Sequence, residues 1–516
     1  MKNNNLFVLA LAFIFSVTTV KINAQGPSDS KIAVVTADEI LKLQAAVEAN
    51  PENIKTHQEY IKAVGLKDPE KLVKQYEVWM KQFPKSVTVP FAIGEGFYKS
   101  ERAEATPYLL KVVSMDPKRG DVYEMLAIDA CRWGDYPSNA KYEKLAMESD
   151  PANFQYARHY ALALKGRDHG EWKTICRDVE KRFAGTDNGA QALGLIGSFS
   201  DDPKESEAVY LELIQKYPPA RFPSAKNAMA SLGRIYLTTA PEKALAIYKQ
   251  VILLDTAKSS QASYAKYSRY AEIFISAQDL INKKQYKEAL TLLNGINAGR
   301  YDGMNVTAKL ILMKAEALSG MGDNVSAYDS MMKRVIANPG DDVLAALKTY
   351  GNKLGKNEQQ IETDRWNSMS EKAKPAPDFD LYAYLQKKNI SLNDLRGKTV
   401  FLSFWFPGCG PCRAEMVHLE PVMKKITDKN FVYVGINGLT EQDPYVESFM
   451  KKTGFSFMPL QDLESKISKA YGVRGYPTNF IIDPTGKIIY TGFMISTPYD
   501  EKMLELMIRS VLDHKS

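Results

Sequence analysis

The pattern of apolar and polar positions changes at about residue 370. Before that point apolar residues recur at helical spacing, and prolines interrupt them at intervals of 33, 33 and 34 residues. These prolines are Pro51, Pro84, Pro117 and Pro151. The same step continues to the turn-like segment 183–189 and to Pro218. A period of 33–34 residues is typical of stacked helical hairpins, so we expect about nine hairpins between residues 35 and 365.

Each period has room for two helices. In the segment RIYLTTAPEKALAIYKQVI we expect one helix to end near Thr239 and the next to begin near Pro241, because proline is tolerated in a first helical turn. Small residues recur where the two helices would approach closely, as at Gly233 with Tyr236 and at Ala244 with Tyr248. This pattern resembles tetratricopeptide repeats over residues 25–368. The resemblance implies a stacked core and binding of protein or peptide partners, and a helical spacer without a ligand is the alternative.

After residue 370 the pattern predicts strands. The run KTVFLSFWF at 398–406 is almost continuously apolar, as in a buried parallel strand. An amphipathic helix over 413–426, a strand over 430–437 and a helix over 443–454 follow. A hairpin with its turn at 483–486 and a last helix over 500–514 complete the order βαβα, β-hairpin, α. We therefore expect a multidomain chain, with an all-α helical-hairpin solenoid, a linker at 369–375 and an α/β domain over 376–516.

The first 24 residues have the pattern of a secretory signal peptide. Lys2 precedes an apolar stretch from Leu6 to Val20, and Ala24 stands before the expected cleavage site at Gln25. The stretch is short for a membrane span, and no cysteine follows the site as in a lipoprotein. We expect an exported, soluble protein of the periplasm or cell envelope. The net charge of +6 is spread along the chain without a basic run, so nucleic acid is not an expected partner.

Four cysteines in a chain of 516 residues do not make a disulfide scaffold. Cys409 and Cys412 form a Cys-Gly-Pro-Cys motif that directly follows the predicted strand and begins a helix. Backbone N–H groups and the helix dipole at that place favour a thiolate, the attacking species in disulfide exchange. We expect Cys409 to be the nucleophile and the more exposed of the pair, and Cys412 to resolve the mixed disulfide.

The other two cysteines, Cys131 and Cys176, fall on predicted helices. They are either buried free thiols or partners in a disulfide, and the sequence leaves both open. A zinc site at the Cys-Gly-Pro-Cys motif would need two further ligands, which its surroundings do not supply. We expect neither a metal nor a cofactor.

The C-terminal part resembles thioredoxin, and more closely the exported reductases of the TlpA and ResA type. The resemblance is carried by the strand leading into Cys-Gly-Pro-Cys, by the segments 376–379 and 391–398, and by YGVRGYPTNFIIDPTGKI at 471–488. It implies that Pro477 is cis and lies opposite the cysteine pair. It also implies that Tyr476 and Thr478 offer backbone groups to an extended substrate. The residues expected to shape the site are Trp405, Gly410 and Pro411.

Glu415 is the accessory residue that the resemblance singles out. Thioredoxin has a buried acid six residues before its first cysteine, where this chain has Ser403, whereas ResA-type reductases have a glutamate three residues after the second cysteine. We expect a partly buried Glu415 with a raised pKa to help deprotonate Cys412. A solvent-facing glutamate is the alternative. Gly408 stands where the family usually has tryptophan, which predicts a more open pocket, and His418 is expected to be an ordinary helix residue.

These features together predict an exported thiol-disulfide oxidoreductase, in the reducing direction, that acts on protein or peptide disulfides. A membrane thiol-transfer protein would supply its electrons, and the helical array would recruit or position partners. One alternative is a binding or scaffold protein whose thioredoxin-like domain is redox-inert. A thiol peroxidase is a third possibility, but Phe406 stands where such a site needs threonine or serine.

Overall fold

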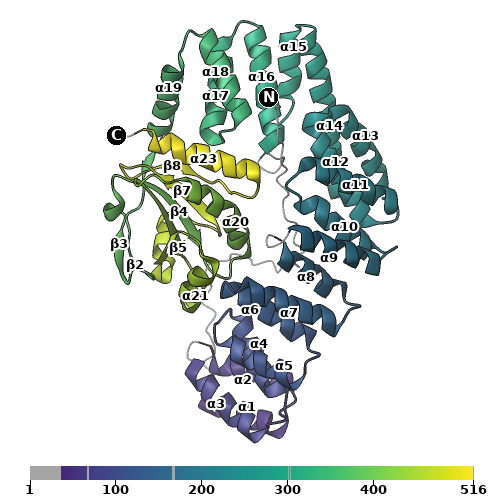
Figure 1. The fold of residues 1–516 in the computed structure, drawn as a ribbon, viewed down its shortest axis with the longest axis vertical. Coiled ribbons are helices and arrows are strands. Elements are labelled where there is room, and N and C mark those ends of the chain that lie inside the picture. The colour runs from purple at the N-terminus through teal and green to yellow at the C-terminus, as the bar shows by residue number, and fades with distance from the viewer. Residues whose placement is uncertain (1–35, 67–68, 166–168, 300–301, 303, 515–516) are drawn as a thin grey trace.

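The computed structural model describes residues 36–66, 69–165, 169–299, 302 and 304–514 (Figure 1). The predicted signal peptide at 1–24 lies outside these residues. Among the helices in the described ranges, none is both long enough and apolar enough to cross a membrane.

The described part of residues 36–370 folds into consecutive antiparallel helices. They are α1 (Ala37–Ala49), α2 (Ile54–Val64), α3 (Pro69–Gln82), α4 (Thr88–Lys99), α5 (Ala105–Met115), α6 (Gly120–Arg132), α7 (Tyr136–Ser149), α8 (Phe154–Leu164), α9 (His169–Arg182), α10 (Asp187–Phe199), α11 (Pro203–Lys216), α12 (Pro223–Thr239), α13 (Pro241–Leu254), α14 (Lys258–Asn282), α15 (Tyr286–Asn294), α16 (Met304–Gly320), α17 (Asn324–Ala337), α18 (Asp341–Lys353) and α19 (Glu358–Ser370). After α1, the described helices form nine successive pairs from α2–α3 to α18–α19. The predicted helical-hairpin array is confirmed.

Local sequence signals fix many of these helix ends. The periodic prolines lie in the turns between pairs, and α12 ends at Thr239 while α13 begins at Pro241, as predicted. Side chains such as Asn53 and Asn153 accept a hydrogen bond from the first turn of the following helix, which satisfies a donor that the helix leaves free. A Cβ atom on Gly233 would lie 2.9 Å from the Tyr248 ring, so the small residue permits the close helix packing that the sequence predicted.

The C-terminal domain is built on one mixed sheet of eight strands in the described residues, in the order β1-β8-β7-β4-β5-β6-β2-β3. The strands are β1 (Lys374–Pro375), β2 (Asp380–Ala383), β3 (Lys388–Ser391), β4 (Thr399–Trp405), β5 (Phe431–Asn437), β6 (Met458–Gln461), β7 (Thr478–Ile482) and β8 (Lys487–Thr491). The helices are α20 (Gly410–Lys425), α21 (Asp443–Thr453), α22 (Lys466–Ala470) and α23 (Pro498–Leu512). The predicted α/β order is confirmed, but the sequence reading omitted β1, β2, β3, β6 and α22.

The central strand β4 is buried along its whole length, which explains its continuous apolar run. It pairs in parallel with β5 and antiparallel with β7. Residues of α20, α21 and α23 share one buried cluster on one face of the sheet, and Phe404, Tyr471 and Phe480 belong to the cluster on the other face. The end of β4, and the cysteine motif that follows it, therefore lie between the buried clusters on the two faces of the sheet.

The helical array curves around the C-terminal domain (Figure 1). Contacts between the described parts of the two include the following. At one contact the Tyr445 hydroxyl on α21 donates a hydrogen bond of 2.9 Å to Asp129 on α6, and the Trp133 ring packs edge-on against Tyr445. At another, the Tyr490 hydroxyl on β8 contacts the sulfur of Met369 on α19 at 3.0 Å. Met369 belongs to the same buried cluster as the cysteine pair, so the array and the domain share a hydrophobic core.

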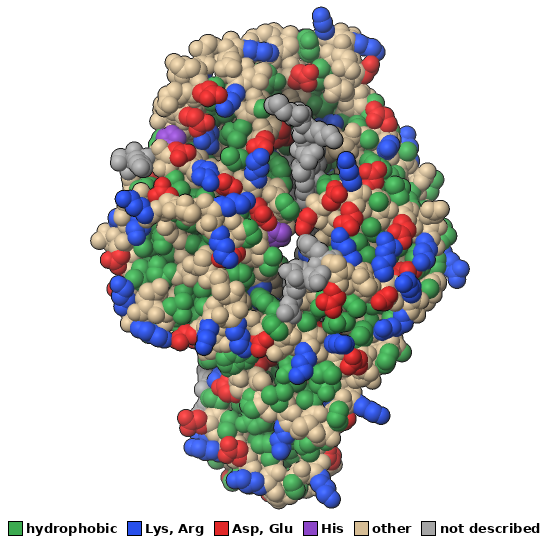
Figure 2. All heavy atoms as spheres, in the orientation of Figure 1, with side chains coloured by type: hydrophobic (Ala, Val, Ile, Leu, Met, Phe, Trp, Pro, Cys, Tyr) green, Lys and Arg blue, Asp and Glu red, His purple; other side chains and the backbone are tan. Residues whose placement is uncertain are grey.

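The segment 369–375, expected to be a linker, contains the end of α19, a turn and the strand β1, which pairs with β8. On the surface drawn in Figure 2, basic and acidic side chains are interspersed over both the array and the domain. This distribution agrees with a net charge that is spread along the chain.

Candidate active site

Cys409 lies at the junction between β4 and α20 and is the N-cap residue of the helix. It forms a disulfide with Cys412, with a Cα–Cα distance of 5.2 Å, and its sulfur accepts a hydrogen bond of 3.1 Å from the Cys412 N–H group. Cys409 is 4% exposed and Cys412 is 1% exposed, so the first cysteine is the more accessible, as expected, although both are buried. Gly410 and Pro411 form the first turn, where the N–H group that proline lacks has no helical partner in any case.

The geometry at this helix end favours a thiolate on Cys409. The Cys412 N–H group donates to its sulfur at the positive end of the helix dipole, a position that stabilises negative charge. Cys412 lies one turn inside the helix and faces the buried cluster. The two sulfurs therefore differ in position, one at the end of the helix and one inside it.

Glu415 lies one turn after Cys412 on α20 and is only 3% exposed. Its Oε1 atom accepts hydrogen bonds of 2.8 Å from the Asn479 side-chain amide on β7 and 2.7 Å from the Ile495 N–H group. Burial raises its pKa to about 7, and the nearby Asp500 carboxyl acts in the same direction. Those two hydrogen bonds and His418 oppose the rise. Glu415 is thus an internal acid that can exchange a proton near neutral pH, and not a solvent-facing helix residue.

Asn479 is a residue that the sequence analysis missed. It pairs across the sheet with Ser403, the residue at the thioredoxin acid position, and both side chains are buried. Ser403 cannot supply a charge at the thioredoxin acid position. Its partner across the sheet, Asn479, instead orients Glu415 through a hydrogen bond. The only sequence signal was its place directly after Thr478 in the motif that follows Pro477.

The segment from Tyr476 to Thr478 lies beside the loop that carries the cysteines. The Tyr476–Pro477 peptide bond is cis, as the resemblance implied. Thr478 pairs with Phe404 at the end of β4, and the Tyr476 ring packs edge-on against Phe406 with centroids 5.2 Å apart. Thr478 is half-buried in strand β7, so this segment borders the site from the neighbouring strand.

Trp405 supports the site from beneath and does not line its surface. The ring is fully buried and packs against Phe449 and Phe457, with centroid distances of 5.1 and 4.9 Å. It belongs to the same buried cluster as Cys409 and Cys412. Its indole nitrogen has no hydrogen-bond partner among the described residues.

The expectation of a more open pocket at Gly408 is wrong, because the side chain of Gln442 fills the space. A Cβ atom on Gly408 would lie 2.6 Å from the Gln442 amide nitrogen. The Gln442 side chain accepts a hydrogen bond from the Gly408 N–H group and donates one to Glu101, in the loop after α4 of the array. A chain of hydrogen bonds therefore runs from the helical array to the residue before Cys409. No motif predicted Gln442, which lies 34 residues from Gly408 in the sequence.

The array also borders the site through the α6–α7 turn. The Arg413 guanidinium, on the turn that begins α20, donates a hydrogen bond of 2.8 Å to the Pro407 carbonyl. Burial raises the pKa of the Cys131 thiol at the end of α6, and the charge of Arg413 opposes that rise. Cys131 and Cys176 are both free thiols, so the alternative of a disulfide between them is not realised.

His418 points away from the cysteines and toward α23. Its Nδ1 atom lies 2.8 Å from the Glu501 carboxylate. It contributes to the charge around Glu415 but touches neither cysteine through any described contact. Its expected role as an ordinary helix residue is compatible with this ion pair.

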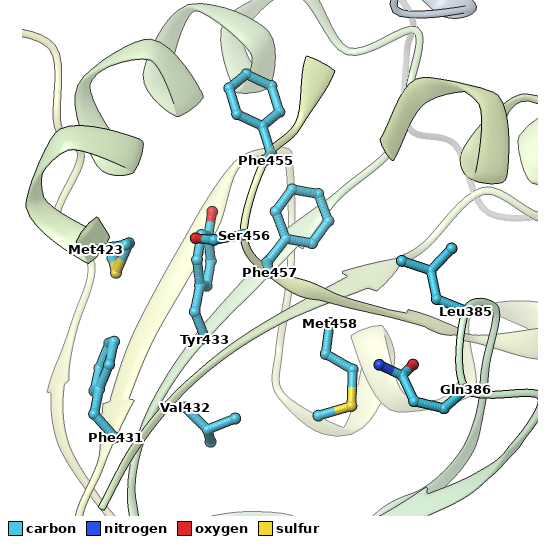
Figure 3. Close-up of a pocket in the computed structure, with 10 residues that line it drawn as sticks. All are labelled: Leu385, Gln386, Met423, Phe431, Val432, Tyr433, Phe455, Ser456, Phe457 and Met458. Atoms are coloured by element: carbon cyan, nitrogen blue, oxygen red, sulfur yellow. The ribbon is translucent and has the colours of Figure 1, made fainter. Parts of the chain in front are cut away.

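A cavity of about 500 Å³ lies elsewhere in the domain (Figure 3). Its lining includes Met423 near the end of α20, Tyr433 on β5 and Phe457 before β6. Met423 is eleven residues beyond Cys412, and at 1.5 Å per residue the two are about 16 Å apart along the helix. The cavity is therefore separate from the cysteine pair.

Comparisons with known proteins find similarity in the C-terminal domain. The Redoxin family model matches residues 371–505. The thiol-disulfide oxidoreductase ResA of Bacillus thuringiensis (strain Al Hakam) is 37% identical over 116 residues, which cover 22% of this chain and 66% of that protein. The ResA of Geobacillus thermodenitrificans (strain NG80-2) is 36% identical over 121 residues, covering 23% of this chain and 68% of that protein.

Among solved structures, a thiol:disulfide interchange protein of the thioredoxin family from Chlorobium tepidum TLS is 26% identical. The match covers 27% of this chain and 97% of that protein, with a TM-score of 0.24. This chain spans about two thirds of the length of the ResA proteins it matches, and the family model locates the similarity in the C-terminal domain.

Proposed function

We propose that this chain is an exported enzyme that reduces disulfide bonds in protein clients. Through its C-terminal domain the chain belongs to the Redoxin family, and there to the thiol-disulfide oxidoreductases of the ResA type. One observation carries the proposal. The cysteine pair lies at the N-terminus of α20, with the buried carboxyl of Glu415 one turn beyond it. This arrangement supplies an activated nucleophile, a resolving thiol and a proton acceptor on one helix.

The reaction begins with the reduced pair. The Cys409 thiolate attacks one sulfur of a client disulfide, forms a mixed disulfide and displaces the second client sulfur as a thiolate, which takes up a proton. Glu415 removes the proton of Cys412, whose thiolate attacks Cys409 and breaks the mixed disulfide. The client sulfur that Cys409 had attacked leaves as a thiolate and takes up a proton, and Glu415 releases the proton that it accepted. Two electrons have then passed to the client, and the enzyme is left with the Cys409–Cys412 disulfide.

The client would bind along the segment Tyr476–Thr478. Thr478 is only half-buried and begins β7, next to the end of β4. An extended client segment can pair with backbone groups there while its disulfide reaches Cys409. Gly410, Pro411 and Trp405 have supporting roles, the first two in the helix turn and the third beneath it.

The direction of the reaction and the location are parts of the same proposal. The Gly-Pro dipeptide between the cysteines and the similarity to ResA favour reduction. The apolar stretch Leu6–Val20 favours export to the periplasm or cell envelope. In an oxidising compartment the pair must be reduced again after each cycle, so we propose a membrane thiol-transfer protein with a reduced dithiol as electron donor.

The helical array would position protein partners beside the redox site. Its support is the contact of α6 with α21 and the hydrogen bonds that link Glu101, Gln442 and Gly408. These contacts hold the array against the loop of the active cysteine, so a partner bound by the array would lie near Cys409. An array placed in this way is more than a spacer between the N-terminus and the domain.

Trapping the mixed disulfide tests the proposed reaction. In a chain with Cys131→Ser and Cys176→Ser, the further change Cys412→Ser leaves Cys409 able to attack but removes the resolving thiol. We expect this variant to accumulate a covalent complex with a disulfide-bonded client peptide, released by dithiothreitol. The matched Cys409→Ser variant should form none. Equal trapping by both variants, or trapping by neither, would contradict the reaction and favour a redox-inert binding domain.

A further inference from the structure

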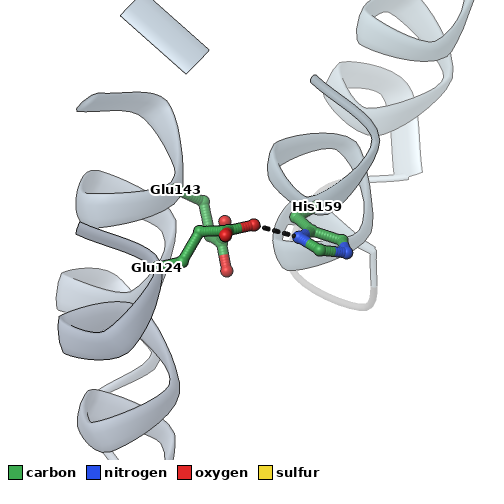
Figure 4. A group of neighbouring side chains, drawn as sticks. All are labelled: Glu124, Glu143 and His159. Atoms are coloured by element: carbon green, nitrogen blue, oxygen red, sulfur yellow. Dashed lines mark hydrogen bonds and ion pairs between the residues drawn. The ribbon is translucent and has the colours of Figure 1, made fainter. Parts of the chain in front are cut away.

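Three side chains with metal-binding atoms meet on the helical array, away from the cysteine pair. Glu124 on α6, Glu143 on α7 and His159 on α8 come from three consecutive helices (Figure 4). Their carboxylate oxygens and imidazole nitrogen all lie within 4.8 Å of one another. The His159 Nδ1 atom is 2.7 Å from a Glu124 oxygen. The array thus brings together two carboxylates and one imidazole that are far apart in the sequence.

Glu143 is the residue that makes this cluster unusual. Its side chain is only 6% exposed, and its Oε2 atom has no hydrogen-bond partner in the part of the chain that the structure describes. Buried carboxylates are ordinarily paired with donors, because leaving one without a partner costs free energy. Its carboxylate lies in one cluster with a second carboxylate, that of Glu124, and with the His159 imidazole.

The imidazole leaves one carboxylate oxygen of the cluster without a partner. His159 contacts Glu124 and not the free oxygen of Glu143. A divalent cation among the three side chains would balance both carboxylates and give that oxygen a partner. The imidazole could then bind the cation in its neutral form.

We propose that Glu124, Glu143 and His159 form a binding site for a divalent transition-metal ion of the zinc class. Imidazole nitrogen together with carboxylate oxygen is a ligand set that zinc accepts, whereas magnesium and calcium prefer oxygen ligands throughout. Two ligand atoms bound tetrahedrally at about 2.1 Å lie about 3.4 Å apart, so small side-chain rotations would bring these three atoms onto one ion. Three protein ligands leave a fourth position for water.

A bound ion would connect the helices of the array that lie beside the cysteine pair. Glu124 is on the same helix as Asp129, which accepts the hydrogen bond from Tyr445 of the C-terminal domain. Because a bound ion would tie α6 to α7 and α8, it would stabilise the part of the array against which that domain packs. The metal site needs no thiol, so its test does not depend on whether the proposed redox reaction is correct.

The test is zinc binding by the full chain, in a form that excludes the redox cysteines as ligands. In a Cys409→Ser, Cys412→Ser background, metal-free protein is titrated with Zn²⁺ by calorimetry, and the thermal midpoint is measured with and without Zn²⁺. We expect one ion per chain and a higher thermal midpoint with Zn²⁺. Glu143→Gln and His159→Gln should each weaken binding at least about 10-fold, since even residues that only support a ligand have effects of this size.

Glu148→Gln is the matched control, because Glu148 is an exposed residue of α7 that pairs with Lys144 outside the cluster. It should leave both the stoichiometry and the affinity unchanged. Circular dichroism of the metal-free variants establishes that they are folded, and the nearly isosteric Glu143→Gln change removes a charge without opening a cavity. Failure to saturate at one ion per chain, or equal binding by Glu143→Gln and Glu148→Gln, would overturn the proposal.

Discussion

The Asn479 side-chain amide donates a hydrogen bond of 2.8 Å to Glu415 Oε1, and so joins β7 to the helix of the cysteine pair. This contact holds a buried carboxyl one turn beyond Cys412. The burial that raises its pKa to about 7 outweighs the two hydrogen bonds that favour the charged form. A proton acceptor with such a pKa works best close to neutral pH.

Replacing Glu415 should therefore change the pH dependence of disulfide release. Glu415 is ionised, and able to accept the Cys412 proton, only above its pKa, so the rate in the unmodified chain should rise through about pH 7. Asp500 and His418 also influence this carboxyl and remain in the variant. We expect Glu415→Gln to slow resolution of the mixed disulfide by about 10²-fold or more and to abolish the inflection near pH 7.

The measurement is a stopped-flow profile of mixed-disulfide resolution between pH 5 and pH 9, values that bracket about two pH units on either side of the carboxyl pKa. Glu420→Gln is the control, because Glu420 is another buried glutamate of α20 that accepts hydrogen bonds from Ser456 instead. It should retain the inflection. An unchanged profile in Glu415→Gln would show that Cys412 loses its proton by another route.

Gly408 and Gln442 should behave as a coupled pair. Gly408→Ala places a methyl group against the Gln442 amide, which we expect to lower the free energy of unfolding by about 1–3 kcal/mol. Gln442→Ala leaves the Gly408 N–H group without its partner and should cost about 1–3 kcal/mol. In the double variant the clash is absent, so its cost should be smaller than the sum of the two.

A double-mutant cycle by urea unfolding measures this coupling. Additive effects within about 0.5 kcal/mol would mean that the two residues are not in the contact described. The same variants report on the array, because Gln442 also donates to Glu101. Glu101→Ala should therefore change the reactivity of Cys409 toward a small disulfide even though Glu101 lies outside the C-terminal domain.

The contact between Tyr445 and Asp129 should contribute to the stability of the whole chain. Tyr445→Phe removes a buried hydroxyl that donates to a buried carboxylate, and we expect it to lower the free energy of unfolding by about 1.5–3 kcal/mol. Tyr382→Phe is the control, because Tyr382 is an exposed residue of β2. Chemical unfolding followed by circular dichroism distinguishes the two. Equal stability of both variants would contradict the packing of the array on α21.

Much of this architecture could be predicted from the sequence because its signals are local. The proline period and the apolar run before Cys409 each depend on a few neighbouring residues, and they located the helical pairs, β4 and the start of α20. The short strands β2 and β3, at one end of the sheet, were missed because each has only four residues, one of them buried, and so carries little apolar alternation. Gln442, Asn479 and the contacts of α6 with α21 depend on long-range packing, which no local pattern encodes.

Gly408 shows how long-range packing can overturn a prediction made from local sequence. The sequence indicated a missing ring, and the simplest inference was empty space. The space is filled by Gln442, which is held in place by Glu101 of a different domain. Only the folded arrangement of array and domain brings these three residues together.

The reduction potential of the Cys409–Cys412 pair tests the central claim most directly. The full chain with Cys131→Ser and Cys176→Ser would be equilibrated in defined thiol buffers, and the reduced fraction would be measured by thiol labelling. The account predicts a reversible two-electron transition at about −270 mV or lower, as for a reductase that a donor must keep reduced. A potential near about −120 mV, typical of a strong oxidant, or the absence of any reversible transition would contradict it.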